Sequence, residues 1–311
     1  MFRRVRTTKL YGLRRRVWRV RRSVPRVARP LSRVLPASSP PSDPLFVVGC
    51  PRSGTTLLLD ALRASGQLAF VQSEGHILWD EFHHPRDHGW RSDAVGPDEI
   101  APGERAYLNL AIRVFARGGR FVDKTPANCL RVAYLEALFP DATFLFIRRR
   151  AASNVSSLME GWRARPRFVR YRLPETLSGL GELAGDRWSF VLVPGWRGLT
   201  AAPLEEICAH QYTACNDAVL EARASSRARW IDVAYESLVA APGEELPRLY
   251  DELGLTYGAS AASFAHELGE RRSATALKTP DRESRRELNE AAIERLVPRL
   301  AETERRLGYA T

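Results

Sequence analysis

The segment from Gly49 to Thr56 combines two glycines, a proline, an arginine and three hydroxyl side chains. It follows a short apolar run at 45–48 of strand type and precedes a stretch at 54–64 whose apolar spacing predicts a helix. At such a junction the backbone N–H groups and the helix dipole both face the loop, where they can hold an anion. The segment therefore predicts an anion-binding loop.

The spacing of Gly49, Gly54 and Thr56 is similar to the nucleotide-binding pattern G-x-x-x-x-G-K-[ST]. Thr55 stands where that pattern has its lysine, and the basic side chain lies inside the loop, at Arg52. No apolar run ends in an obvious metal-binding aspartate. Hydrolysis of Mg-ATP is therefore poorly supported.

A second candidate anion site follows the apolar run at 142–147, which is the clearest strand pattern in the chain. That run leads into Arg148, and Ser156 follows eight residues later, in a helix predicted to begin near residue 151. Because Arg148 leaves the carboxyl end of the strand and Ser156 lies two helical turns further on, both can converge on one phosphate.

The run from Pro51 to Leu57 resembles the 5′-phosphosulfate loop of sulfotransferases that use 3′-phosphoadenosine 5′-phosphosulfate (PAPS), in particular the tyrosylprotein and carbohydrate-type bacterial branch. The resemblance implies a P-loop-like α/β fold and a reaction without metal. It implies that Arg148 and Ser156 hold the 3′-phosphate of the donor. The residues that it implies for the 5′-phosphosulfate are Arg52, Ser53, Gly54, Thr55 and Thr56.

Three more positions acquire roles from the same resemblance. The segment 121–126, Phe-Val-Asp-Lys-Thr-Pro, resembles the K-[TD]-P segment of the family, which implies that Lys124 contacts the transferring sulfuryl group. The segment 235–238, Tyr-Glu-Ser-Leu, resembles the Y-E-x-L segment, which implies that Tyr235 lies near the donor nucleotide. Late loops of the family also contact the donor, and Lys278 is the candidate for that contact.

Sulfuryl transfer to a hydroxyl needs a base, in-line placement of the reactants and cations on the developing charge. Arg52 and Lys124 are the candidate catalytic cations. Glu74 resembles the catalytic glutamate of the tyrosylprotein-type branch, and we predict it as the general base. His76 is the alternative base near neutral pH.

The histidines His83, His84 and His88 lie among acidic residues, but Pro85 and Gly89 make a continuous metal-binding helix unfavourable. We predict no metal site, and we assign 72–102 to an acceptor-side loop. The stretch 161–202 is rich in Arg, Trp, Gly and Pro without a clean period, and we predict an acceptor-side insertion. The alternative for its arginines is an ordinary solvated surface.

The basic character of the chain is concentrated near its start. Residues 1–42 carry 13 of the 47 basic residues and no acidic one, and removing these 13 charges from the net +11 leaves −2. Apolar spacing at 7–24 predicts a basic amphipathic helix for an anionic membrane surface, and the prolines after it predict a linker. A disordered leader is the alternative. A nucleic-acid partner is not indicated.

Strand-like runs alternate with helical stretches from residue 45 onward, which predicts an α/β fold with three layers and a central, mainly parallel sheet. We therefore divide the chain into a basic, Pro-rich tail at 1–44 and a sulfotransferase-like domain at 45–311. The four cysteines form no C-x-x-C pair, and a reducing compartment follows as the default. The predicted location is cytoplasmic, with a peripheral association at the inner membrane face as an extension.

The leading hypothesis is a sulfotransferase that moves a sulfuryl group from PAPS to an acceptor hydroxyl on a glycan, a lipid-linked molecule, a phenol or a peptide. The alternatives are a P-loop kinase or NTPase, and a protein that binds an anionic polymer without catalysis.

Overall fold

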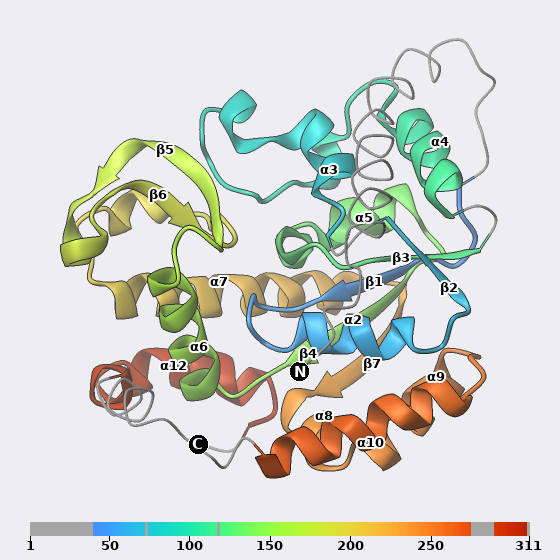
Figure 1. Cartoon of the computed structure of the whole chain (residues 1–311). Coiled ribbons are helices and arrows are strands. Elements are labelled where there is room, and N and C mark those ends of the chain that lie inside the picture. Colours follow the sequence, from blue (N-terminus) through green and yellow to red (C-terminus); the bar gives the residue numbers. More distant parts are fainter. Residues whose placement is uncertain (1–39, 72–73, 117–118, 275–288, 310–311) are drawn as a thin grey trace, which may run out of the picture.

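The computed structural model describes residues 40–71, 74–116, 119–274 and 289–309 (Figure 1). The predicted helix at 7–24 and Lys278 lie outside these residues. Within the described residues, no helix combines the length and the apolar character that crossing a membrane requires.

The centre of the molecule is a sheet of five parallel strands in the order β2-β3-β1-β4-β7. β1 lies between β3 and β4, so the strand order reverses beside it (Figure 1). In open parallel sheets the crevice at the carboxyl ends of the strands at such a point is the usual ligand site. The strands are β1 (Leu45–Val48), β2 (Leu68–Phe70), β3 (Arg120–Asp123), β4 (Thr143–Arg148) and β7 (Arg229–Ala234).

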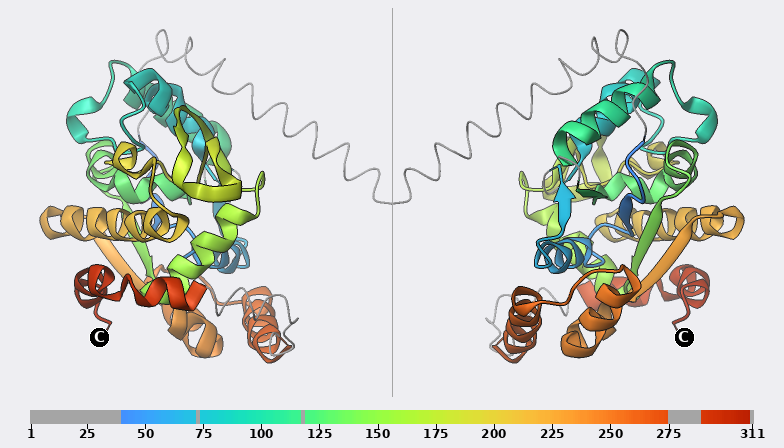
Figure 2. Two further views of the ribbon diagram at one scale, coloured as in Figure 1. Left: turned by 90° about the vertical axis from the view of Figure 1, so that its left-hand side faces the viewer. Right: turned by 90° about the vertical axis from the view of Figure 1, so that its right-hand side faces the viewer.

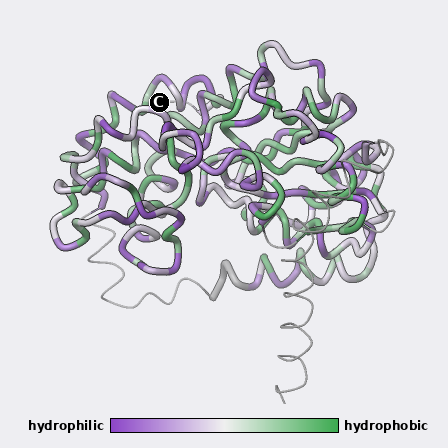
Figure 3. The backbone as a smooth tube through the Cα atoms, turned by 90° about the horizontal axis from the view of Figure 1, so that it is seen from above, coloured by the Kyte–Doolittle hydropathy of each residue, from purple (hydrophilic) through white to green (hydrophobic). Residues whose placement is uncertain are grey.

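Alternate residues of β1 enter opposite cores, as expected for a strand that is covered on both faces. Leu45 and Val47 pack into one buried cluster, whereas Phe46 and Val48 pack into the other. The hydropathy colouring of Figure 3 shows hydrophobic stretches within the fold and many hydrophilic turns around it. The predicted three-layer α/β fold is confirmed.

Two groups of helices cover the sheet, as the turned views in Figure 2 illustrate. The helices of the Leu45 side are α2 (Thr55–Arg63), α8 (Tyr235–Ala240), α9 (Pro242–Glu252) and α10 (Ala259–Ala274). Those of the Phe46 side are α3 (His76–His83), α4 (Glu104–Ala116), α5 (Val132–Leu138), α6 (Ala151–Arg163), α7 (Leu204–Ser225) and α12 (Val297–Arg306).

Short 3₁₀ turns connect several of these elements. The helical stretch from 126 to 138 is divided at Arg131, whose guanidinium is buried and donates to the Asp93 carbonyl at 2.7 Å. The hydrogen bond between Arg131 and the distant residue Asp93 thus interrupts the helix at this point. The turns are η1 (Pro85–His88), η2 (Pro97–Glu99), η3 (Pro126–Leu130), η4 (Ser178–Leu183) and η5 (Trp196–Leu199).

The predicted insertion contains an antiparallel hairpin, with register shifts, of β5 (Val169–Leu177) and β6 (Gly185–Ser189). This second sheet lies apart from the central one, to the left in Figure 1. Tyr171, Leu173 and Leu177 are buried, and charged residues alternate with the first two. The hairpin stands beyond the carboxyl ends of the central strands, where it forms one wall of a cavity.

Candidate active site

The loop between β1 and α2 has the backbone geometry of an anion cradle. Gly54 has φ 108°, and a Cβ there would lie 2.5 Å from Cδ2 of Tyr235. Gly54 is also the N-cap of α2 and makes no side-chain cap, so the first N–H groups of the helix are available for a ligand. From the opposite side, Asn154 of α6 donates from Nδ2 to the Pro51 carbonyl at 2.9 Å. These contacts hold the loop open toward the cavity.

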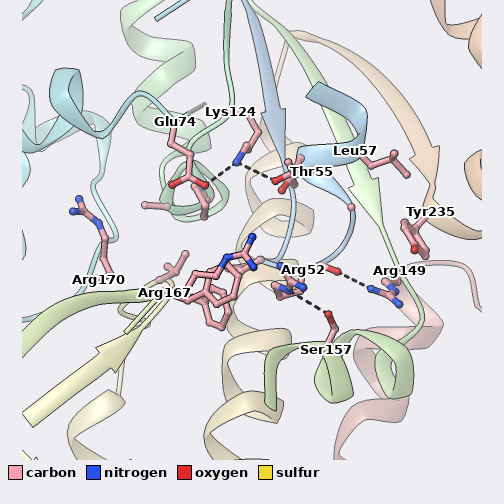
Figure 4. Close-up of a pocket in the computed structure, with 18 of the residues that line it drawn as sticks. Arg52, Thr55, Leu57, Glu74, Lys124, Arg149, Ser157, Arg167, Arg170 and Tyr235 are labelled. Carbon is pink, nitrogen blue, oxygen red and sulfur yellow. Dashed lines mark hydrogen bonds and ion pairs between the residues drawn. The ribbon is translucent and has the colours of Figure 1, made fainter. Parts of the chain in front are cut away.

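A cavity of about 500 Å³ extends from this loop to the hairpin (Figure 4). Its lining includes four of the predicted loop residues, while Ser53 is buried behind the loop at 1% exposure. The predicted residues that line it are Arg52, Gly54, Thr55, Thr56, Glu74, Lys124 and Tyr235, and the hairpin side contributes Arg167, Phe168, Val169, Arg170, Phe190 and Val191.

Three arginines concentrate positive charge in this cavity. Arg52, Arg149 and Arg167 all line it, and within the described part of the chain none of them has an acidic partner. Burial, followed by the charges of Arg149 and Arg167, lowers the pKa of Arg52. Arg149 Nε is buried without a hydrogen-bond partner among the described residues. Uncompensated guanidinium groups around an open helix N-terminus favour a ligand with several negative charges.

The predicted second anchor, Arg148 with Ser156, lies outside the lining of this cavity. Arg148 does not line the cavity; its guanidinium lies 5.9 Å from the ring centre of Tyr309. Ser156 is also outside the lining, and its Oγ accepts from Asn289 Nδ2 at 3.1 Å. The side chain of Arg148 at the end of β4 and that of Ser156 on α6 both point toward the carboxyl-terminal segment, which contributes Asn289 and Tyr309.

Arg149 and Ser157 line the cavity, and they have the same spacing of eight residues. Arg149 donates to the Arg52 carbonyl at 2.9 Å and lies over the ring of Tyr235 at 4.2 Å. Ser157 Oγ accepts from Arg52 Nε at 3.2 Å. Both contacts appear in Figure 4, and they connect the second anchor directly to the loop.

Glu74 and Lys124 meet at the other side of the loop. Lys124 Nζ lies 2.7 Å from Glu74 Oε1 and 3.4 Å from Thr56 Oγ1, and His76 Nε2 lies 3.0 Å from Glu74 Oε2. Burial raises the pKa of Glu74, but the hydrogen bond to His76 and the charge of Lys124 outweigh it, so the pKa falls to about 2. Glu74 is therefore ionised at neutral pH.

A buried polar network positions this pair. Gly75 N–H donates to Thr125 Oγ1 at 2.8 Å, which joins the Glu74 segment to the residue after Lys124. Asp123 accepts from Trp79 Nε1 at 2.9 Å and from Asn128 Nδ2 at 2.7 Å. Burial raises the pKa of Asp123, which is a cost that these donors offset. The end of β3 thus fixes the ammonium group against the carboxylate.

His83, His84 and His88, the histidines that could have suggested a metal site, engage separate partners. His83 is buried and pairs with Glu104 at 2.9 Å, His88 Nε2 contacts the Phe82 carbonyl at 2.8 Å, and His84 Nδ1 accepts from the Arg86 N–H. Across the described residues, no group of three or more His, Cys, Asp or Glu side chains is arranged to hold a metal ion.

Sequence reasoning missed Asn154, Arg149 and Ser157, and it placed Arg167 only among the arginines of the acceptor-side insertion. Asn154, Ser157 and Gly161 are spaced as one face of a helix, which is a signal that Ser157 shares a face with Asn154. Arg167 carries no comparable signal because it is one of many arginines in an aperiodic stretch.

Comparisons with known proteins agree with this geometry. Residues 44–189 match the model of the Sulfotransferase family. The nodulation protein NoeE of Sinorhizobium fredii is 28% identical over 235 residues, covering 68% of this chain and 51% of that protein. The chain thus spans about half the length of that relative.

The crystal structure of sulfotransferase STF9 from Mycobacterium avium resembles the fold with a TM-score of 0.53 at 17% identity, covering 86% of this chain and 77% of that one. The resemblance first found in the glycine loop is confirmed, because residues 44–189, which contain that loop, are similar to the sulfotransferase family.

Proposed function

We propose that the protein transfers a sulfuryl group from PAPS to the hydroxyl of an acceptor. The observation that carries the proposal is the convergence of Arg52, Arg149 and Arg167, without acidic partners in the described part of the chain, on the open N-terminus of α2. A donor with a phosphosulfate at one end and a phosphate at the other supplies the negative charge that this cavity lacks.

The proposal places the 5′-phosphosulfate at the amides of 54–56 and the 3′-phosphate at Arg149 and Ser157. The adenine base then faces the apolar end of the cavity, where Leu57, Tyr235, Val239 and Leu268 form its lining. Figure 4 shows Leu57 and Tyr235 on this side and the Glu74–Lys124 pair across the loop from them. The assignment keeps the predicted role of Tyr235 and replaces Arg148 and Ser156.

In this scheme Lys124 places its ammonium group on the sulfuryl oxygens, where negative charge develops. Glu74 takes the proton of the acceptor hydroxyl. At the same time the oxygen of that hydroxyl bonds to sulfur, and the bond from sulfur to the phosphate oxygen of the donor breaks. Lys124 is one of the groups that keep the pKa of Glu74 near 2. When Lys124 turns to the sulfuryl group, the carboxylate loses that stabilisation and becomes a stronger base.

The acceptor approaches from the hairpin side, opposite the donor loop. Glycan, lipid-linked, phenolic and peptide hydroxyls remain the candidate classes, and the contact of 7–24 with an anionic membrane remains a prediction. Incubation with radiolabelled PAPS and one acceptor of each class measures the transfer directly.

Thermal unfolding tests donor use before an acceptor is known. We expect 3′,5′-adenosine bisphosphate, the product of PAPS, to raise the melting temperature in the presence of EDTA. A response to Mg-ATP alone would support a P-loop NTPase instead. Salt-sensitive binding of an anionic polymer without any nucleotide response would support a non-catalytic binding protein.

A further inference from the structure

Arg167 comes from the hairpin side of the cavity, yet its guanidinium lies beside the donor loop. The Cζ atom of Arg52 lies 5.0 Å from the ring centre of Phe168, and the Cζ atom of Arg167 lies 5.2 Å from the same centre. Two guanidinium groups from separate parts of the chain therefore share contact with one aromatic ring. Arg52 also contacts Ser157, so Arg167 adjoins the proposed phosphate site.

Arg167 differs from the arginines around it. Within the described residues it has no acidic partner, while its neighbours on the same stretch are all engaged. Arg163 pairs with Glu160, Arg170 with Asp80 and Arg172 with Asp186, and Arg165 donates to the carbonyls of Leu183 and Arg187. The cation that faces the donor loop is thus the one left available.

The hairpin is seated on the face of α6 that carries Ser157. Phe190 stacks on Phe168 with ring centres 5.1 Å apart, and a Cβ at Gly161 would lie 2.3 Å from Phe190 Cζ. Ser157 and Gly161 are four residues apart, so the aromatic pair lies one helical turn from the Arg52 contact. The glycine lets the aromatic pair approach the helix closely enough to border the donor site.

Backbone strain occurs at two residues that line this part of the cavity. Phe190 has φ 64° and Arg52 has φ 70°, which are backbone angles that residues other than glycine rarely adopt. Such strain persists only where surrounding contacts enforce it, and it concentrates at ligand sites. We therefore expect the backbone at Arg52 in the loop and at Phe190 beside the hairpin to be held rigidly on the two sides of the cavity.

We infer that Arg167 is a donor-binding residue supplied by the hairpin, and that the adjoining Phe168–Phe190 pair separates the donor from the acceptor. This inference rests on the proposed function. Arg167 and Phe168 directly precede β5, whose hairpin forms the acceptor side of the cavity. A donor bound to Arg167 therefore also holds this side of the cavity in place.

The test is calorimetric titration of 3′,5′-adenosine bisphosphate into the wild-type protein, Arg167→Ala and Arg172→Ala. Charge-assisted hydrogen bonds contribute about 1.5–3 kcal/mol, so Arg167→Ala should weaken binding by roughly 10- to 150-fold. Arg172→Ala is the matched control on the same hairpin, because its exposed ion pair with Asp186 contributes little. Arg167→Lys should recover part of the affinity.

The outcomes separate this inference from the proposed function. If the wild-type protein binds the bisphosphate and Arg167→Ala binds it equally well, Arg167 is not a donor residue and only the inference fails. If the wild-type protein does not bind it, both fail. An equal loss in Arg172→Ala would indicate a general effect of hairpin charge and would also overturn the specific role of Arg167. Circular dichroism of each variant confirms that it folds.

Discussion

Lys124 Nζ lies 2.7 Å from Glu74 Oε1, and the side chain of Lys124 is 3% exposed. The two residues come from different segments, one at the end of β3 and the other just before α3. Each charge neutralises the other. The candidate base and the candidate sulfuryl-binding cation are therefore held against each other.

Replacing Glu74 should remove the base without removing the donor site. Once an acceptor is found, Glu74→Gln should lower kcat by about 100- to 10,000-fold, the usual contribution of a general base. Binding of 3′,5′-adenosine bisphosphate should persist. Asp60→Asn, an exposed change on α2, is the control for an unspecific loss of carboxylate. Full activity of Glu74→Gln would exclude Glu74 as the base.

The depressed pKa of Glu74 makes a prediction about stability in acid. The folded-state pKa of about 2 lies below the ordinary value of 4.5, so the ionised form stabilises the fold above pH 4.5. That contribution is lost as the pH falls from 4.5 toward 2. Lys124→Met raises the pKa of Glu74, so the melting temperature of this variant should fall less steeply than the wild-type value over that interval. Parallel curves would show that Lys124 does not stabilise the carboxylate.

The proposed anchor of Arg149 and Ser157 predicts opposite results for neighbouring residues. Arg149→Ala and Ser157→Ala should weaken binding of 3′,5′-adenosine bisphosphate, because both side chains contact the loop through Arg52. Arg148→Ala and Ser156→Ala are the matched controls and should leave the affinity nearly unchanged. Isothermal titration of the four variants compares them directly. A larger loss in the Arg148 and Ser156 variants would restore the original prediction.

The sequence alone does not decide which of two neighbouring pairs lines the cavity. The sequence contains Arg148, Arg149 and Arg150 in a row, followed by Ser156 and Ser157, so a spacing of eight residues is satisfied twice. Only the start of α6 at Ala151 and its packing decide which pair faces the loop. The resemblance located the motif, and the tertiary structure shows which of the two Arg–Ser pairs lines the cavity.

Elements with strong local patterns were predicted well, and elements stabilised by distant contacts were not. The strands β1 and β4 are continuous apolar runs, and the loop between β1 and α2 has a distinctive composition. By contrast, α3 has only eight residues and no side-chain cap, and buried Trp79 anchors it through Asp123. The β5–β6 hairpin was missed because arginine, proline and glycine mask its alternation.

The close contact of Gly54 with Tyr235 predicts a functional loss beyond backbone strain. Gly66→Ala introduces a Cβ at φ 67° with no heavy atom within 4 Å, which should cost about 1–2 kcal/mol of stability. Gly54→Ala adds an overlap at 2.5 Å with Tyr235 Cδ2 and should cost more. Denaturant unfolding measures both variants. Only Gly54→Ala should also lose its response to the bisphosphate, and a retained response would refute the loop assignment.

The most direct test of the central claim compares two nucleotides that differ only at the 3′ position. Wild-type protein is titrated in EDTA with 3′,5′-adenosine bisphosphate and with adenosine 5′-monophosphate. If one nucleotide is held at both ends by the loop and by Arg149 with Ser157, the bisphosphate should bind at least about 10-fold more tightly, the value of a charge-assisted hydrogen bond. Equal affinities, or no binding of either nucleotide, would contradict the account.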